Sequence, residues 1–270
     1  MLRVEGIAVS FGGVQALGGV SLSAEAGAVT GLIGPNGAGK TTLFNVVTGF
    51  QRPTRGEVWI DGRNVTSVFG LKSLLAWPPG TGRVPMKPHT RSRLGLGRTF
   101  QRLELFGSLS ARENLLVAVE ARRGRGGHQS QSRAADEIIE RVGLQSVAGR
   151  QADTLGTGMA RLVELGRALA TRPKLLLLDE PSSGLDQAET HALGQLLAGL
   201  AAEGMAVLLV EHDVDLVMRV CNRVHVLDFG RMIADGSPAE VQADPRVQLA
   251  YLGAEAGEAP AKGSGAGVGG

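Results

Sequence analysis

The sequence predicts an α/β fold with a mostly parallel core sheet, an N-terminal antiparallel β subdomain and a helical subdomain. Three observations lead to this fold class. Short apolar strands alternate with helical patterns in the C-terminal half, which is typical of parallel, helix-covered sheets. A glycine-rich loop joins an apolar strand to a helix near the N-terminus. Most of the stretch from 111 to 170 has a helical pattern.

Composition limits the class of protein. The 270 residues are 43% hydrophobic, which supports a sizeable buried core. The formal net charge is +2 and no run of like charges stands out, so nothing predicts a nucleic-acid partner. The longest apolar runs, such as Leu175–Leu178, are far shorter than the about 20 residues that cross a bilayer. Because Cys221 is the single cysteine and no secretion signal is visible, we expect a protein of the reducing cytosol.

The N-terminal part of the chain has several apolar runs bounded by glycines. The predicted strands are Leu2–Phe11, Val20–Ala24, Ala28–Ile33 and 56–62, and the predicted helix is Lys40–Thr48. Gly12 and Gly13 predict the turn between the first two strands. Residues 64–93 contain several prolines, including Pro78, Pro79 and Pro88, and we interpret them as an inserted surface loop.

The remaining chain divides into a helical part, a strand-and-helix part and a tail. The helical subdomain is expected at about 102–170, with a linker at 124–132 that is rich in glycine, serine and glutamine. The later predicted elements are the strands Lys174–Leu178, Met205–Val210 and Arg223–Leu227 and the helices Gln187–Glu203 and Val214–Val220. Residues 254–270 are poor in large apolar side chains, which predicts a disordered tail after a domain of residues 1–253.

The glycine-rich loop has the pattern of a phosphate-binding loop. It has two glycines with four residues between them, followed by a lysine and a threonine, and it lies between a strand and a helix, so it predicts a P-loop NTPase. Backbone amides of such a loop wrap phosphate oxygens, the lysine reaches the β and γ phosphates, and the threonine binds magnesium. The predicted nucleotide-binding residues here are Gly34, Pro35, Asn36, Gly37, Ala38, Gly39, Lys40, Thr41 and Thr42.

Charged and polar residues follow two of the predicted parallel strands. Asp179 and Glu180 end one strand, at the sheet edge where ligands bind in such folds, and His212 follows the next strand along the chain. We expect Asp179 to hold magnesium through water and Glu180 to polarise the attacking water. We expect His212 to donate a hydrogen bond to the γ phosphate. Taken alone, the two acids also fit a helix cap, and a single histidine is more often structural.

These residues resemble the ATP-binding subunits of ABC transporters, over residues 2–253. The resemblance implies ATP and Mg²⁺ as substrate and cofactor. It also implies that Phe11 stacks on adenine and that Gln101 links the γ phosphate and magnesium to a transmembrane permease, so that Gln101 joins Thr41 and Asp179 at the metal. The loop that contacts a second ATPase matches Ser183, Gly184, Leu185 and Asp186.

Two further segments resemble branched-chain amino acid importers, and urea importers share much of this pattern. They are 98–106, with Arg98-Thr99-Phe100-Gln101, and the C-terminal stretch 239–253, with Ala250-Tyr251-Leu252-Gly253. The resemblance implies an importer ATPase at the cytoplasmic face of the membrane. Its permease would dock at Gln101–Asn114, and an extracytoplasmic solute-binding protein would be an indirect partner.

In this family each ATP lies between the phosphate loop of one ATPase and the signature sequence of the other, usually LSGGQ. The corresponding residues here are Leu155, Gly156, Thr157, Gly158 and Met159. Only Leu155 and Gly158 match, and Gly156 lacks the serine hydroxyl that would bond the partner's γ phosphate. We therefore expect an asymmetric heterodimer in which a second ATPase supplies a regular signature.

Three alternatives remain at this stage. A nucleotide-binding scaffold with little turnover would fit Gly156, although Glu180 and His212 favour an enzyme. ABC ATPases of repair or translation usually carry two ATPase halves or a long coiled coil, and this chain shows neither a repeat nor heptads. Finally, four arginines suggest a nucleic-acid surface, but without interleaved aromatics we interpret them as a solvated face. They are Arg91, Arg93, Arg98 and Arg102.

Overall fold

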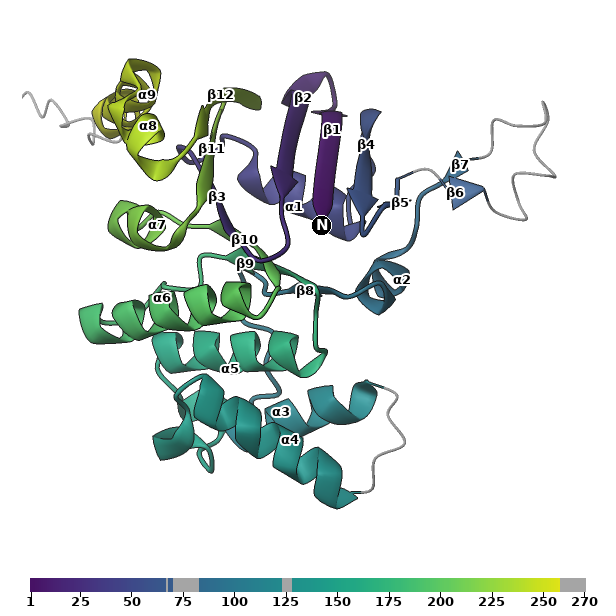
Figure 1. The fold of residues 1–270 in the computed structure, drawn as a ribbon, viewed down its shortest axis with the longest axis vertical. Helices are drawn as coiled ribbons and strands as arrows, with labels where there is room; N and C mark the ends of the chain where they lie inside the picture. The colour runs from purple at the N-terminus through teal and green to yellow at the C-terminus, as the bar shows by residue number, and fades with distance from the viewer. Residues whose placement is uncertain (67, 70–82, 123–127, 258–270) are drawn as a thin grey trace, which may run out of the picture.

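The computed structural model describes residues 1–66, 68–69, 83–122 and 128–257 (Figure 1). They form a six-stranded sheet, a four-stranded antiparallel sheet and a layer of helices below the six-stranded sheet. Among these residues, no helix is both long enough and apolar enough to cross a membrane. The solved structures described below share this α/β architecture, which confirms the predicted fold class.

The six-stranded core sheet positions the residues that were predicted to form the site. Its strands lie in the order β12-β11-β3-β10-β9-β8, and neighbours are parallel except for the antiparallel pair β11 and β12. The bounds are β3 Val29–Ile33, β8 Leu96–Arg98, β9 Leu175–Asp179, β10 Ala206–Val210, β11 Arg223–Asp228 and β12 Arg231–Gly236. Strands β8 and β12 escaped prediction because β8 has three residues with a central glycine and β12 begins with an arginine and ends in Asp-Gly.

The antiparallel sheet has the order β2-β1-β4-β5 and lies at the top of Figure 1. Its strands are β1 Leu2–Phe11, β2 Val14–Ala24, β4 Arg55–Ile60 and β5 Arg63–Asn64, and a separate pair joins β6 Val68–Phe69 to β7 Arg83–Val84. Strand β2 begins before the predicted Val20 because its first residues pair with the end of β1, for example Leu17 with Val9. Glycines and a glutamine hide the strand pattern there.

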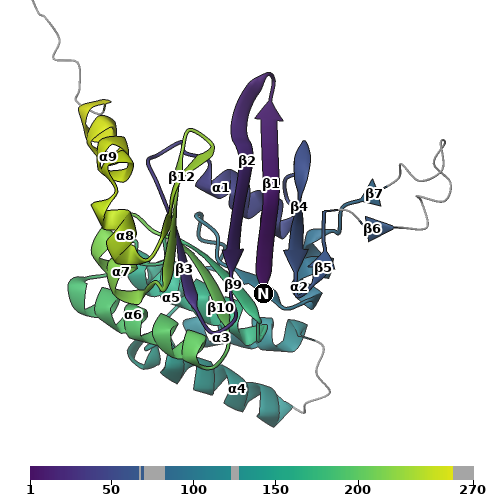
Figure 2. The same ribbon diagram turned by 45° about the horizontal axis from the view of Figure 1, so that its top comes forward.

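Six of the described helices lie in two groups. Helices α3, α4 and α5 lie at the bottom of Figure 1, with α6 above them, whereas α8 and α9 lie beside β12 (Figure 2). The bounds are α1 Lys40–Thr48, α2 Pro88–Arg93, α3 Ala111–Ala121, α4 His128–Arg141, α5 Thr157–Ala170, α6 Gln187–Ala202, α7 Val214–Val220, α8 Pro238–Ala243 and α9 Pro245–Gly257. Residues 128–132, which we predicted to be linker, form the start of α4, and 123–127 lie outside the described residues.

Two hydrophobic cores lie on opposite faces of the core sheet. In β9, Leu176 and Leu178 join the core between the sheet and α3–α6, whereas Leu175 and Leu177 join the core around α1 and the antiparallel sheet. This alternation is the two-residue period of a strand buried on both faces, and it explains why β9 is apolar at successive positions. The sheet edge that follows β9 is therefore held rigidly from both sides.

Part of the segment 64–93, which we interpreted as an inserted surface loop, is helical. Pro88 does not interrupt structure but starts α2, at the first helical position where a missing N–H costs nothing. Arg91 of α2 is 1% exposed, so the prediction of a solvated face is wrong at this position. Its guanidinium donates to the carbonyls of Val46 and Val47 at the end of α1, at 2.7 Å each. Burial lowers the pKa of Arg91 to about 10. Residues 67 and 70–82 lie outside the described residues.

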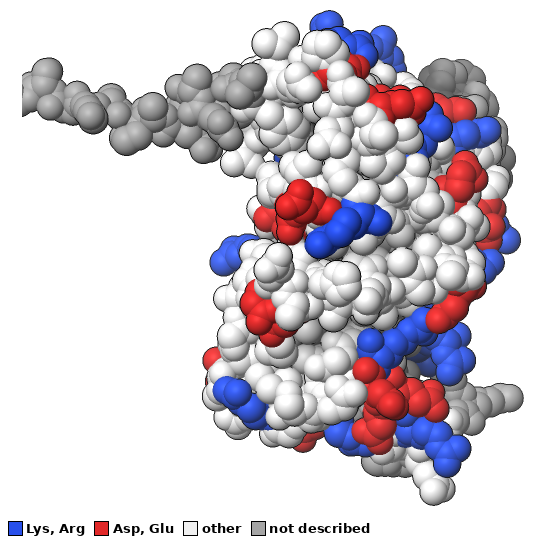
Figure 3. Space-filling view, turned by 60° about the vertical axis from the view of Figure 1, so that its left-hand side comes forward, with Lys and Arg blue, Asp and Glu red and all other residues white. Residues whose placement is uncertain are grey.

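The C-terminal end also differs from the prediction. Helix α9 continues through Gly257, so residues 254–257, assigned to a disordered tail, are helical. The rest of that predicted tail, 258–270, lies outside the described residues. On the face shown in Figure 3, positive and negative side chains are interspersed, in keeping with the formal net charge of +2.

Candidate active site

The phosphate loop packs directly on the backbone of two neighbouring strands. A Cβ at Gly34 would lie 1.9 Å from the Leu227 carbonyl oxygen, and one at Gly39 would lie 2.8 Å from the Ala16 carbonyl oxygen. Both glycines also have positive φ angles, 148° and 105°. Close approach and backbone conformation therefore both require glycine here. By contrast, a Cβ at Gly37 would meet nothing within 4 Å, so this part of the loop is open to a ligand.

Lys40 is the first residue of α1 and is buried. Its Nζ donates hydrogen bonds to the carbonyl oxygens of Gly34 at 2.5 Å and Pro35 at 3.0 Å, which hold the lysine inside the loop. Burial lowers the pKa of Lys40, while the negative charges of Glu180 and Asp179 act in the opposite direction. The loop lysine and the two acids predicted from sequence are thus brought together.

Asp179 and Glu180 lie at the carboxyl end of β9 and have different surroundings. Asp179 is 1% exposed, and burial raises its pKa. Glu180 has a φ of 51°, a strained conformation for a residue with a side chain, and its N–H donates to the Val210 carbonyl at 2.9 Å. This bond and the turn that follows direct the Glu180 side chain out of the sheet edge, where it is partly exposed.

His212 lies against Glu180, as two neighbouring parallel strands allow. The His212 Nε2 is 2.8 Å from Glu180 Oε1. The preceding residue, Glu211, is buried, and its carboxylate accepts hydrogen bonds from the N–H groups of Ser182 and His212. Burial raises the pKa of Glu211. Glu211 thereby ties the His212 turn to the segment before the predicted dimer-contact loop.

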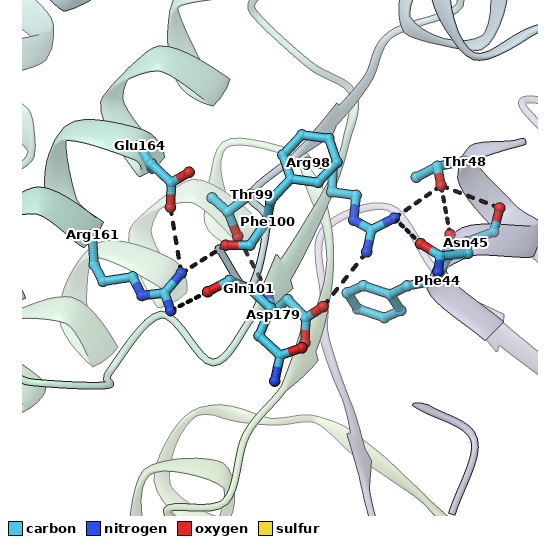
Figure 4. A network of polar contacts seen from close by, with 10 residues as sticks. All are labelled: Phe44, Asn45, Thr48, Arg98, Thr99, Phe100, Gln101, Arg161, Glu164 and Asp179. Carbon is cyan, nitrogen blue, oxygen red and sulfur yellow. Dashed lines mark hydrogen bonds and ion pairs between the residues drawn. The ribbon is translucent and has the colours of Figure 1, made fainter. Parts of the chain in front are cut away.

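Arg98 was predicted to be a solvated residue, and the structure contradicts this. It ends β8 and reaches toward α1, with a side chain only 7% exposed, and its Nη2 is 3.5 Å from Asp179 Oδ2 (Figure 4). Its Nη1 donates to Asn45 Oδ1 and Thr48 Oγ1 of α1. A buried carboxylate such as that of Asp179 needs a counter-charge. Arg98 supplies it, although the sequence pattern predicted this arginine to lie on the surface. Arg93 and Arg102 are exposed, as predicted.

Gln101 lies in the segment that connects the core sheet to the helical layer. Arg161 of α5 donates hydrogen bonds to the carbonyl oxygens of Phe100 and Gln101, at 2.6 Å each (Figure 4). Glu164 of the same helix accepts from the Glu104 N–H at 3.0 Å. Burial raises the pKa of Glu164. The Gln101 side chain itself is exposed, which leaves it free to reach a ligand.

The signature segment begins α5, with Gly156 as N-cap and no side-chain cap. Gly158 is buried against the predicted dimer-contact loop, because a Cβ there would lie 2.5 Å from the Gly184 carbonyl oxygen. A Cβ at Gly184 would in turn lie 2.9 Å from Thr157 Cβ, so Thr157 packs on this loop. A Cβ at Gly156, by contrast, meets nothing within 4 Å. A serine would fit at 156, so its absence is not imposed by packing.

Two aromatic residues lie at the ends of the site. Phe11 ends β1 and is 50% exposed, which leaves its ring available for stacking. Tyr251 of α9 is partly buried, and burial raises the pKa of its phenol, while the nearby backbone of Gly34 acts in the opposite direction. The sequence singled out Tyr251 only by resemblance, and its contact with the phosphate loop depends on how α9 folds back.

The site fits a magnesium ion bound together with a nucleotide. Asp179 Oδ2 is buried and makes the 3.5 Å ion pair with Arg98 but no hydrogen bond, and Thr41 is exposed in the first turn of α1. In the part of the chain that the structure describes, no group of three or more His, Cys, Asp or Glu residues could hold a metal ion alone. A single carboxylate and a hydroxyl beside a phosphate loop suit Mg²⁺, which keeps several waters and binds through one or two carboxylates plus substrate phosphates.

Comparison with known proteins identifies the family to which this chain belongs. The family model described as ABC transporter matches residues 17–183. The chain belongs to the ABC transporter family. A second model, described as branched-chain amino acid ATP-binding cassette transporter, matches residues 231–257, which include β12, α8 and α9. Family membership confirms the resemblance inferred from sequence and the assignment of the chain as an ATPase.

Relatives match almost the whole chain. BraF of Pseudomonas aeruginosa, a high-affinity branched-chain amino acid transport ATP-binding protein, is 38% identical, and the match covers 94% of this chain and 98% of BraF. LivG of Salmonella typhimurium, which has the same description, is 37% identical with the same coverage. The ADP conformation of MJ1267, an ATP-binding cassette of an ABC transporter, is 31% identical with a TM-score of 0.76, and covers 94% of this chain and 98% of that one.

Proposed function

We propose that this chain is the ATP-hydrolysing subunit of an importer for branched-chain amino acids. The observation that carries the ATPase assignment is the convergence of Lys40, Asp179, Glu180 and His212 at one sheet edge beside the phosphate loop. The substrate class rests on the C-terminal family match, which covers the helices that follow β12, and on the descriptions of the relatives. Urea import is less favoured by these matches.

The geometry supports a separate role for each group of residues in ATP hydrolysis. The phosphate loop and Lys40 bind the phosphates of ATP, with Phe11 against the adenine. Thr41, Gln101 and Asp179 would hold the Mg²⁺, which would offset charge on the phosphates when bound. Glu180 is oriented by its bond to His212 and polarises the attacking water, while His212 is placed to donate to the γ phosphate. The strained Glu180 backbone keeps this carboxylate at the sheet edge.

A groove between the core sheet and the helical layer supports permease docking. It has a volume of about 1350 Å³ and is lined by aromatic residues, including Phe50, Phe100 and Phe106, and by charged ones, including Arg93, Glu104 and Arg167. It adjoins the segment 101–114 that the sequence assigned to this contact. We infer that a permease segment with an apolar face and charged ends binds here, placing the chain at the cytoplasmic face of the membrane.

Transport in a reconstituted system tests the proposed function. The complex of this chain with its permease and second ATPase would be placed in proteoliposomes, with ATP on the side of the ATPases and the binding protein on the other. Labelled leucine, isoleucine and valine are expected to enter only with ATP and Mg²⁺, and labelled urea is not. Urea uptake without amino acid uptake would contradict the substrate class, and absence of phosphate release would contradict the ATPase role.

We further infer that the partner is a different ATPase and that the pair is asymmetric. Gly156 offers the partner's ATP no hydroxyl at the position of the signature serine, and the Cβ and methyl group of the exposed Thr157 lie against Gly184. A hydrogen bond to a charged group contributes about 1.5–3 kcal/mol, so its loss slows the partner's site by roughly tenfold or more. The site of this chain, completed by a regular signature from the partner, then carries most of the turnover.

Restoring a serine at 156 tests this asymmetry. Gly156→Ser introduces a hydroxyl without a clash, because a Cβ there meets nothing within 4 Å. We expect phosphate release at the partner's site to rise by about tenfold. It would be measured in a complex in which this chain also carries Glu180→Gln, so that its own site does not contribute. Gly149→Ser is the matched control, since Gly149 is exposed and equally open. Equal rates for the two variants would contradict the inference.

A further inference from the structure

We propose that Arg91 is a positioning residue for the phosphate loop: it fixes the end of α1 and fastens that helix to the base of the segment 64–93, that is, to Val65 and Met86. This inference rests on the proposed function and extends it to a segment outside the site. The observation behind it is one buried guanidinium whose hydrogen bonds join α1 to both of these residues.

Helix α1 depends on other segments for its order. It has nine residues, fewer than the about 12–15 below which isolated helices are marginal in water. Five of the nine are β-branched, which lowers helix propensity, and Lys40 places a positive charge at the positive end of the helix dipole. The last turn contains no basic residue. A cation that stabilises this end therefore has to come from another part of the chain.

Arg91 brings that cation from α2. Its Nη1 donates to the carbonyl oxygens of Val46 and Val47, at 2.7 Å each, in the last turn, where helical carbonyls run out of partners within the helix. The contact is close, because a Cβ at Gly49, the C-cap of α1, would lie 2.9 Å from Arg91 Nε. Arg91 thus stabilises the end of α1 by charge as well as by hydrogen bonding.

The rest of the guanidinium holds the base of the segment 64–93. Nη2 donates to the Val65 carbonyl at 3.0 Å, and Nε donates to the Met86 carbonyl at 2.9 Å. The two residues also bond each other, since the Met86 N–H donates to the Val65 carbonyl at 2.9 Å. They lie on either side of the β6–β7 pair. One planar group therefore sets the positions of all these carbonyls relative to one another.

The burial of Arg91 indicates that this connection matters. The side chain is 1% exposed, and the acceptors of these hydrogen bonds are backbone carbonyls rather than a carboxylate. Burying a charge in this way is expensive, and an apolar side chain of similar size would fill the space at lower cost. An apolar side chain, however, could not bond the helix to the segment. What Arg91 adds is the connection itself, through hydrogen bonds that are shielded from water.

The connection acts on the phosphate loop through the length of α1. The helix is about 14 Å long, and its first residue is Lys40, so the orientation of its first turn follows that of its last turn. Arg91 therefore sets the angle at which Lys40 and the first turn meet the phosphates. Because such coupling is reciprocal, a nucleotide that orders α1 also orders Val65 and Met86.

ATP affinity of the full chain tests the first consequence. Arg91→Lys keeps the charge but loses the fork, so it cannot bond α1 and the base of the segment as arginine does. The Kd for ATP with Mg²⁺ is expected to rise about tenfold, while kcat of the assembled complex at saturating ATP changes less than twofold. Arg133→Lys, an exposed change on α4, should alter neither quantity. An unchanged Kd in Arg91→Lys would overturn the proposal.

A second control separates positioning from a loss of stability. Val142→Ala removes two methyl groups from the hydrophobic core that does not contain α1, so it should lower Tm without changing the Kd. A purely structural Arg91 would behave in the same way, with fewer active molecules, a lower apparent kcat and the same Kd. A Kd raised equally in Val142→Ala would overturn the proposal. If the unchanged chain binds no ATP, the proposed function fails instead.

Amide hydrogen exchange tests the second consequence. A non-hydrolysable ATP analogue with Mg²⁺ is expected to slow exchange of the Met86 N–H about tenfold in the unchanged chain and less than twofold in Arg91→Lys. The Asp61 N–H, which donates to the Met1 carbonyl, is the internal reference and should not respond. Equal slowing in both chains would overturn the proposal. So would an unchanged Met86 rate in the unchanged chain, a result that stands even if Arg91→Lys folds poorly.

Discussion

Replacing Lys40 with methionine is expected to weaken ATP binding by roughly ten- to a hundredfold and to reduce phosphate release to background. The lysine contributes charge-assisted hydrogen bonds to the phosphates, each worth about 1.5–3 kcal/mol. It also donates to the carbonyls of Gly34 and Pro35, so its loss loosens the loop in the absence of nucleotide. Binding of a fluorescent ATP analogue, measured by titration, checks the first effect, and steady-state phosphate release checks the second.

The control for Lys40→Met is the same substitution at a lysine outside the site. Lys87→Met removes an exposed lysine at the N-cap of α2 whose side chain makes no capping bond. Lys40→Arg separates charge from shape, because a planar guanidinium cannot take the place of an ammonium held between two carbonyls. We expect it to lose most activity as well. ATP affinity in Lys40→Met equal to that in Lys87→Met would contradict the role of Lys40.

Replacing Glu180 with glutamine is expected to lower turnover by roughly a hundred- to a thousandfold while ATP binding is retained. General-base catalysis contributes about 10²–10⁴ to rates, and the amide cannot accept the proton. Glutamine preserves the size of the side chain and its contact with His212, 2.8 Å away in the native protein. Single-turnover and steady-state phosphate release would be measured beside equilibrium ATP binding.

The pattern of loss distinguishes Glu180 from a structural carboxylate. Glu137→Gln, an exposed change on α4, should leave both turnover and binding unchanged. If Glu180→Gln instead weakened ATP binding with unaltered turnover at saturation, Glu180 would be a binding residue. A stable nucleotide-bound complex in Glu180→Gln that decays slowly is the expected signature of lost hydrolysis alone.

Much of the fold and of the site follows from local sequence patterns. The apolar β9 and β10 predict parallel strands, and the rule that ligands bind at their carboxyl edge brings Asp179, Glu180 and His212 together, as the contact between His212 and Glu180 shows. The phosphate loop is predictable for the same reason: its glycines, lysine and flanking elements are contiguous in the chain. The bounds of α1 and α7 agree with the predicted ranges.

The residues that escaped prediction depend on contacts between distant segments. Arg98 and Arg91 look like surface residues in a charged stretch, and only tertiary structure places one beside Asp179 and the other beneath α1. Arg161 and Glu164 lie on a helix whose pattern reveals a buried face but not the loop bonded to it. Short strands such as β8 carry too few residues for a periodic signal.

Gly156 distinguishes this signature segment from the usual LSGGQ sequence. Sequence resemblance identified the missing hydroxyl, and the structure adds that a serine would fit there and that Thr157 packs on Gly184. The phosphate loop belongs to this chain, and in the proposed pair the groups that close over its ATP come from the partner ATPase. In that proposal, this chain is the more productive half of a paired motor.

The most direct test of that claim compares two complexes. In one, Glu180→Gln is introduced in this chain; in the other, the corresponding glutamate of the partner ATPase is changed to glutamine. Steady-state phosphate release is measured for both beside the unchanged complex, at the same saturating ATP and Mg²⁺. An asymmetric pair is expected to lose nearly all turnover in the first complex and much less in the second. Equal losses in the two complexes would contradict it.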